Sequence, residues 1–449
     1  MTSRALGWQA APARALLKLA GPITLSSISF AFMGVVDTLL VGGLGPAVLA
    51  GVGLGIVITN GLMGFGFGLL RGVKVLLAQA RGRGEHASAQ VYARAGLVVA
   101  LWLGVLMMAL GEGAALFVGR FAASPEAGEA ARRYIAVRSL GMPIILGYVA
   151  LREARYGFGE TRAPLISALA GNLAHALLDY VALYVLAWGA AGAATANVLA
   201  FTVQACLLGV AQRSGGFAMG KEERAAAWEV ARVGAFTGMQ FALEIGSLAA
   251  LSLLLAGVSD HQMAAHQIAV QLAAFCFLPA LAIGESATLM AAEALGSGRT
   301  ALVREVAHVA RNVALIYAGL CALVLTLGGG PIAHAFTKDE ALVSVVRVVL
   351  VATAAHQLLE AMAVTGHGVL RGVGAARLSA LCALGCAWLC TPWLGYLLVR
   401  QLELGALGAW VARCVELCLA SFIVWRAIER GSWARPAPRR AVALESSAA

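Results

Sequence analysis

Charge is scarce in this sequence. Only 12% of its 449 residues are Asp, Glu, Lys or Arg, against about 25% in an ordinary soluble domain. Hydrophobic residues make up 60% of the chain, and the mean hydropathy is +0.83. Because a soluble domain needs polar side chains to cover its surface, this composition excludes one and predicts an integral membrane protein.

The motifs of common enzymes are also missing. The chain has no HExxH, no GxSxG and no P-loop, so we expect neither an enzyme nor an ATP-driven pump, and no bound cofactor. The eight cysteines form no CxxC pair; three of them, Cys382, Cys386 and Cys390, share a helical stripe that fits a packed helix face better than a soft metal site. The N-terminus lacks an apolar core followed by a small-residue cleavage site, so we expect no cleaved signal peptide.

Long apolar runs dominate what remains. Crossing the hydrocarbon takes roughly 20 apolar residues, because a helix must satisfy its own backbone hydrogen bonds there. The mostly apolar residues from 165 to 212 exceed one crossing and are interpreted as a hairpin. The predicted spans are 19–42, 46–70, 96–119, 134–155, 165–187, 189–212, 233–257, 264–290, 303–327, 343–369, 378–399 and 405–428.

Basic residues fall unevenly around these twelve spans. If the N-terminus is cytoplasmic, the termini and the loops after even-numbered spans hold 25 of the 33 Lys and Arg residues, and the opposite side holds 8. This asymmetry predicts a multi-pass protein of the inner (plasma) membrane with both termini in the cytoplasm. The excess of basic residues in the predicted cytoplasmic segments also accounts for the net charge of +10. We therefore expect the protein to contact the lipid bilayer and not to bind nucleic acid.

The chain repeats itself at a spacing of about half its length. "LLAQARGRGEHA" at 76–87 recurs as "MAAEALGSGRTA" at 290–301, and "YGFGETR" at 156–162 recurs as "RGVGAAR" at 371–377. The predicted fold is an all-α integral membrane protein with twelve transmembrane helices in two six-helix lobes related by internal duplication. Transporters built from such repeats bind substrate between the halves. The predicted parts are an N-terminal lobe at 15–212, a cytoplasmic linker at 213–230, a C-terminal lobe at 231–430 and a cytoplasmic tail at 431–449.

A few polar residues lie inside the predicted spans. A charge at mid-membrane costs about 2.5–3.5 kcal/mol on insertion scales, so such a residue usually faces a cavity and has a role. Asp37, Asp179 and Asn197 lie at similar depths in the first, fifth and sixth spans. Asn172 and His175 share one helix face with Asp179, and together these groups can hold a proton or a small cation. The alternative is that Asp179 and Asn197 only satisfy each other or nearby backbone.

The second lobe has its own polar set. Glu244 lies midway along the seventh span and Glu360 midway along the tenth, with His356 one turn away from Glu360 on the same face. The two carboxylates could instead pair with a buried basic residue, for which Arg232 and Arg371 are the nearest candidates in the sequence.

Four segments of the sequence resemble the multidrug and toxic compound extrusion (MATE) family. They are "DTLLVGGLGPAVLAGVGLG" at 37–55, "AQARGRG" at 78–84, "AAHQI" at 264–268 and "GVLRGVGAAR" at 368–377. The resemblance implies a two-lobed antiporter that exports organic, often cationic, compounds in exchange for H⁺ or Na⁺. It also implies that Asp37 and Asp179 belong to the cation site of the first lobe, and that Glu244 and Glu360 help to bind a metal ion in the second.

We therefore expect a monomeric, cation-coupled exporter of amphipathic or cationic small molecules that works by alternating access. His175 stands where the family usually has Asn, and His can itself titrate, so the choice between H⁺ and Na⁺ stays open. The alternative function is a flippase for lipid-linked sugars. A flippase for anionic carriers should line its cavity with Arg or Lys, whereas the mid-membrane charges here are acidic.

Overall fold

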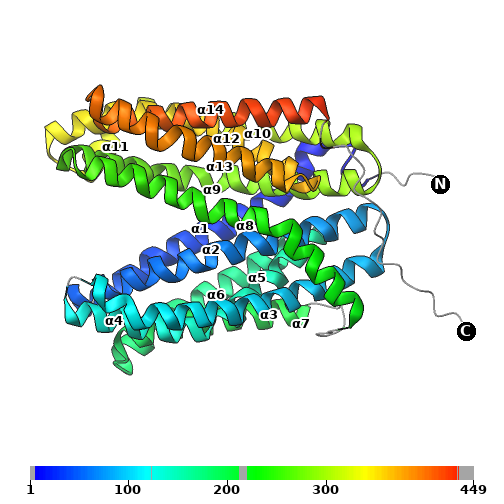
Figure 1. Cartoon of the computed structure of the whole chain (residues 1–449), viewed down its shortest axis with the longest axis horizontal. Coiled ribbons are helices and arrows are strands. Elements are labelled where there is room, and N and C mark those ends of the chain that lie inside the picture. Colours follow the sequence, from blue (N-terminus) through cyan, green and yellow to red (C-terminus); the bar gives the residue numbers. More distant parts are fainter. Residues whose placement is uncertain (1–5, 123, 212–219, 432, 434–449) are drawn as a thin grey trace, which may run out of the picture. The chain divides into compact units, whose positions relative to one another are not determined.

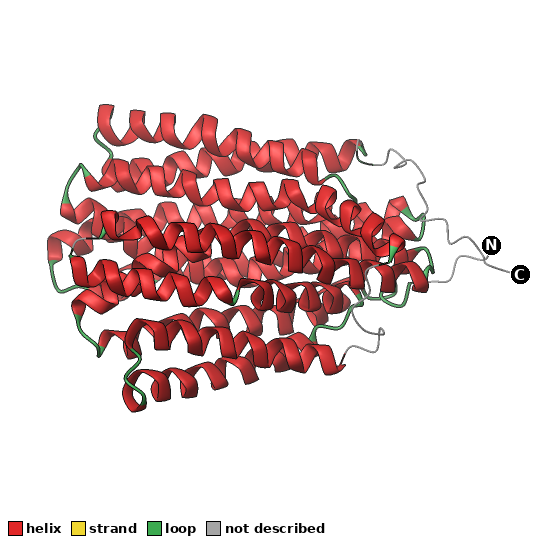
Figure 2. Cartoon of the chain, turned by 60° about the horizontal axis from the view of Figure 1, so that its bottom comes forward, coloured by secondary structure: helices red, strands yellow, loops and turns green. Residues whose placement is uncertain are grey.

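The computed structural model describes residues 6–122, 124–211, 220–431 and 433, and every regular element among them is helical (Figures 1 and 2). Within these described residues, eleven helices are long and apolar enough to cross a membrane, and α4 and α5, bent by 52° against each other, together are long and apolar enough to form a twelfth span. The prediction of twelve spans is confirmed. Large apolar side chains on the helix surfaces, such as Val210, Leu389 and Trp393, are exposed as lipid contact requires.

The two halves of the chain follow a similar order of elements, except that the pair α4 and α5 in the first half corresponds to the single helix α12 in the second. The first half consists of α1 (Pro12–Gly42), α2 (Pro46–Gly82), α3 (His86–Phe117), the 3₁₀ turn η1 (Val118–Phe121), α4 (Pro125–Leu140), α5 (Met142–Gly157), α6 (Arg162–Tyr180), the π-helical turn η2 (Val181–Val185) and α7 (Gly189–Ala211). The second consists of α8 (Lys221–Ala256), α9 (Asp260–Gly296), α10 (Thr300–Leu327), α11 (Gly329–Phe336), α12 (Glu340–Gly372), α13 (Ala376–Tyr396), the π-helical turn η3 (Leu397–Gln401) and α14 (Gly405–Arg430).

The fourth span differs from the prediction. The apolar run 134–155 was expected to form one helix, but the chain bends at Gly141, between α4 and α5. Pro143 explains the bend, because proline has no backbone N–H and its ring crowds the preceding turn.

Backbone conformation repeats between the halves as the sequence does. Gly84 and Gly298 follow α2 and α9 with φ angles of 79° and 77°. Gly159 and Gly374 follow α5 and α12 with φ angles of 80° each. Glycine favours these turns because a side chain is strained at positive φ. Both halves thus end equivalent helices in the same way, which supports the duplication.

By internal contacts the chain forms two units whose borders lie inside helices. Among the described residues, the N-terminal unit is Leu25–Met239, and the C-terminal unit joins the residues up to Thr24 to those from Gln240 onward. Helix α1 therefore contributes its beginning to the C-terminal unit, and α8 contributes its beginning to the N-terminal unit. The lobe boundaries 15–212 and 231–430 stay predictions.

The predicted linker 213–230 is helical where it is described. Residues 213–219 lie outside the described residues, but α8 already begins at Lys221. Its first turns bind α3 in the N-terminal unit: Glu223 pairs with Arg94 at 3.1 Å, and Glu229 accepts a hydrogen bond from Tyr92 at 2.8 Å. This stretch is thus a packed part of helix α8, and its cytoplasmic location stays a prediction. Of the predicted tail 431–449, only Gly431 and Trp433 are described.

Helix α8 also crosses α2 at very close range. A Cβ atom on Gly234 would lie 1.8 Å from the carbonyl oxygen of Leu69, and one on Gly68 would lie 2.5 Å from the Cα atom of Gly238. Only glycine allows the two backbones to approach in this way, as in other membrane helix pairs with small residues at their contact.

Each unit has its own apolar core. In the N-terminal unit, α2, α3 and α5 bury residues such as Leu70, Val73 and Ile145. In the C-terminal unit, α9, α12 and α14 bury Ala269, Leu350 and Ala409 among others. These cores fix the helices from which the polar residues of each unit project.

Candidate functional site

Helix α6 places three polar side chains on one buried face. Asn172, His175 and Asp179 are 9%, 5% and 0% exposed, as their spacing along a helix predicts. The Nε2 atom of His175 lies 3.3 Å from the Oδ2 atom of Asp179. The imidazole and the carboxylate therefore act as one polar group inside the unit.

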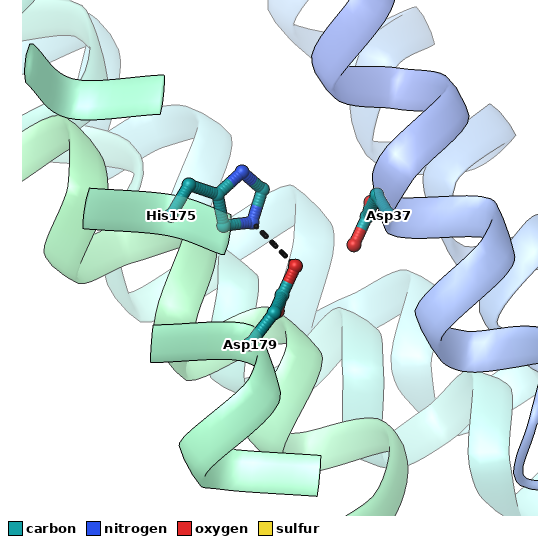
Figure 3. A group of neighbouring side chains, drawn as sticks. All are labelled: Asp37, His175 and Asp179. Carbon is teal, nitrogen blue, oxygen red and sulfur yellow. Dashed lines mark ion pairs between the residues drawn. The ribbon is translucent and has the colours of Figure 1, made fainter. Parts of the chain in front are cut away.

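Asp37 of α1 faces this pair (Figure 3). One potential ligand atom from each of Asp37, His175 and Asp179 lies within 4.8 Å of the other two. Among the described residues these three form the one group of His, Cys, Asp or Glu side chains close enough to share a metal ion. The structure thus brings together the residues that the sequence placed at one depth in the first and fifth spans.

Three of the four carboxylate oxygens in this group lack a hydrogen-bond donor. Among the described residues, nothing donates a hydrogen bond to the buried Oδ1 of Asp37 or to either carboxylate oxygen of Asp179. A buried carboxylate with no donor is costly, so it either takes up a proton or binds a cation. Two carboxylate oxygens and an imidazole nitrogen suit both, and the group therefore fits a site that is filled and emptied.

Two hydrogen bonds hold α1 against this part of the chain. The side-chain amide of Asn172 donates to the hydroxyl of Ser29 at 2.6 Å, and the hydroxyl of Tyr184, in η2, donates to the carbonyl of Leu40 at 2.6 Å. They lie on either side of Asp37 along α1. Asn172 thus has a positioning contact in the structure, and its role as a cation ligand stays a prediction.

Asn197 and Arg138 are further polar residues of the N-terminal unit. In the described part of the chain, the buried Oδ1 atom of Asn197 has no hydrogen-bond partner, so it accepts no hydrogen bond from Asp179. Arg138 of α4 donates to the hydroxyl of Tyr134 and to Asn60, and its charge acts on His175. The sequence analysis did not identify Arg138, although it lies inside the predicted span 134–155.

In the C-terminal unit, Glu244 and Glu360 line the same cavity. Glu244 accepts a hydrogen bond from the side chain of Gln240 at 2.9 Å. The Oε2 atom of Glu360 lies 3.6 Å from Nδ1 of His356, so the predicted common face of these two residues holds. The structure brings the predicted residues to one place, and a metal ion between the two carboxylates stays a prediction.

A buried ion pair that the sequence analysis did not identify lines this cavity too. Arg413 of α14 donates to both carboxylate oxygens of Glu416, at 2.9 and 2.7 Å, and Thr391 of α13 also donates to Glu416. Arg371, named from the sequence as a possible partner of Glu244 or Glu360, lies 3.5 Å from Glu285 instead. The signal for the pair was the i, i+3 spacing of Arg and Glu in "RCVE" at 413–416, within the twelfth span.

Comparisons with known proteins agree on one family. The sequence model of the MatE family matches twice, at residues 22–181 and 237–397, as the duplication predicts. The chain is 28% identical to the probable multidrug resistance protein NorM of Pseudomonas aeruginosa, over 97% of this chain and 92% of that protein. It is 26% identical to the multidrug resistance protein MdtK of Yersinia pestis, over 92% and 94%.

Solved structures share the fold. An outward-facing multidrug resistance MATE family transporter superposes with a TM-score of 0.86 at 20% identity, over 95% of this chain and 97% of that one. The eukaryotic MATE transporter AtDTX14 gives a TM-score of 0.84 at 16% identity, over 94% of this chain and 96% of that one. The two matches to the family model together cover more than half of this chain, which therefore belongs to the MATE family of transporters.

Proposed function

We propose that this protein is a cation-coupled antiporter that exports amphipathic or cationic small molecules by alternating access. The group formed by Asp37, His175 and Asp179 carries the proposal, since three of its carboxylate oxygens are buried with no hydrogen-bond donor in the described part of the chain. The multidrug resistance names of the NorM and MdtK relatives support the substrate class. The inner membrane is the proposed location.

Repulsion between two carboxylates supplies the coupling. Asp37 and Asp179 repel each other when both are ionised, and a proton or a sodium ion between them removes that repulsion. The ion favours the state of the N-terminal unit in which the two carboxylates are close, while the exported molecule favours the other state. A difference of this kind in the affinities of two states is what exchange requires.

Efflux from proteoliposomes tests the function. Dyes loaded into the vesicles should leave faster under an imposed proton gradient or an imposed sodium gradient than without one, and the gradient that works identifies the ion. Glu244→Gln and Glu360→Gln should weaken stimulation by sodium if the C-terminal unit binds that ion. Efflux of every dye at the rate of protein-free vesicles under both gradients would remove antiport of such compounds and leave the flippase as the better hypothesis.

The proposed orientation has its own test. Both termini and the beginning of α8 are proposed to lie in the cytoplasm, and Lys338, before α12, on the opposite side. In a cysteine-free background, Lys338→Cys should react with an impermeant thiol reagent in intact cells, and Lys221→Cys should react only after the cells are opened. The reverse pattern would invert the topology.

A further inference from the structure

Two cavities in the C-terminal unit share part of their lining. Glu360, Phe277 and Arg413 line both. Glu244 lies in the wall of one, and Trp410 in the wall of the other. The shared lining thus combines an acidic, a basic and an aromatic side chain.

Arg413 uses only one of its nitrogen atoms within the protein. Both of its hydrogen bonds come from Nη1 and go to Glu416. Among the described residues nothing accepts a hydrogen bond from Nε or Nη2. Both atoms keep some exposure, because neither is among the fully buried polar atoms that lack a partner. The Arg413 side chain is 19% exposed. Nε and Nη2 form one edge of the guanidinium plane, and this edge is available to a ligand.

Glu360 is available in the same way. Its neighbour His356 lies at 3.6 Å, which is beyond hydrogen-bond distance, and the Glu360 side chain is 18% exposed. No ion pair within 4.0 Å joins it to Arg413 in the described part of the chain, although the charges of Glu360 and Glu244 act on Arg413. The cavity therefore offers a free carboxylate and a free guanidinium edge that do not satisfy each other.

Most of the other side chains that line the cavity with Trp410 are apolar or aromatic. Phe277 and Trp410 line the cavity beside Glu360, and the ring of His356 meets Trp410 edge-on with centroids 5.1 Å apart. This contact orients the indole. Aromatic walls of this kind hold flat rings, and their faces also attract cations.

The geometry points to a binding site for aromatic zwitterions. In this inference, which rests on the proposed export function and names its substrate class, a carboxylate of the ligand pairs with the free edge of Arg413. A cationic group of the ligand pairs with Glu360, and its rings pack against Phe277 and Trp410. A guanidinium edge binds a carboxylate through two parallel hydrogen bonds, which a lysine ammonium cannot reproduce. Arg413 is then the residue that selects ligands bearing a carboxylate.

Equilibrium binding of two matched dyes tests this site. One is a rhodamine with a free benzoic carboxylate, and the other is its methyl ester, so that the two dyes share the aromatic frame and the amino groups. Binding to the purified full-length protein is followed by fluorescence polarisation without any ion gradient. Arg413→Lys keeps the charge that pairs with Glu416 and removes the free edge. Glu360→Gln keeps the shape of the side chain and removes its charge.

The wild-type protein should bind the acid more tightly than the ester. Arg413→Lys should weaken binding of the acid by about 10-fold or more and that of the ester by less than about 3-fold, because one charge-assisted contact is lost. Glu360→Gln should weaken both dyes. An unchanged unfolding temperature of Arg413→Lys serves as the control for folding. Arg413→Gln, which is neutral, provides a second variant with the same expected selectivity.

Equal losses for the two dyes in Arg413→Lys and Arg413→Gln would overturn the assignment, as would a wild-type preference for the ester. Failure of the export function has a different signature. In that case the acid still binds selectively and Arg413 still controls it, but no gradient drives efflux of either dye.

Discussion

Replacing Asp37 by Asn should disconnect efflux from the ion gradient. The ligand atoms of Asp37 and Asp179 lie within 4.8 Å of each other. Two unit charges at that distance repel by about 3.5 kcal/mol at an effective dielectric constant of about 20. A bound cation removes this repulsion, so the repulsion contributes to the driving force for cation binding. In Asp37→Asn this contribution is absent, and the affinity for the cation should fall by a factor of a few hundred.

The assay compares dye efflux from proteoliposomes under one fixed gradient. Asp37→Asn should lose nearly all of the gradient-driven rate, whereas Thr38→Val should keep it. Thr38 is a matched control because it is the next residue on α1 and its hydroxyl is exposed and bonded to the carbonyl of Gly34 in its own helix. The unfolding temperature of Asp37→Asn in the absence of a gradient should equal or exceed that of the wild type, because a buried repulsion has been removed.

Two results would refute this reasoning. Asp37→Asn that transports at the wild-type rate would show that the Asp37 carboxylate is not needed for coupling. A marked fall in the unfolding temperature would show that the carboxylate instead stabilises the fold.

Two further predictions concern stability. Lys74 and Glu153 form a buried ion pair at 2.9 Å, and both side chains are 2% exposed. Lys74→Met should therefore lower the free energy of unfolding by about 3 kcal/mol, and the double variant Lys74→Met/Glu153→Gln should recover part of the loss. A Lys74→Met variant as stable as the wild type in chemical unfolding would contradict this. At the start of α12, the hydrogen bond from His261 and that from the backbone N–H of Ala341 lower the pKa of Asp339. The pair should therefore stabilise the protein above about pH 4, the ordinary value for Asp, and lose this effect as the pH falls through the lowered pKa. His261→Ala should reduce the unfolding temperature most above about pH 4, and a difference from wild type that is independent of pH would count against the pair.

Much of the fold could be predicted because the membrane imposes a length on each helix. Apolar runs gave the twelve spans, and the hairpin within 165–212 is confirmed by η2 and the start of α7 at Gly189. The bend at Gly141 was missed because hydropathy does not register a change in helix direction. Depth and helical spacing were enough to group Asp37, His175 and Asp179, since each lies well inside an apolar run and two of them share a face.

The pairing of helices could not be read in the same way. Arg413 lies only eight residues after the start of α14, where a basic residue resembles one that reaches the membrane surface. Its partners Glu416 and Thr391 show that it points into the unit, and this depends on how α14 is rotated against α13. Arg138 was missed for the same reason, because the depth of a residue in the sequence does not show how its helix is rotated.

The division of α1 and α8 between the units has a consequence for biosynthesis. The ribosome makes the segment of α1 up to Thr24 first, yet this segment packs in the unit that is made last. The N-terminal unit in turn stays incomplete until residues up to Met239 have been translated, when more than half of the chain has emerged. Neither half of the gene therefore encodes a part that is complete on its own. Two fragments divided between α7 and α8 should accumulate only when they are produced in the same cell.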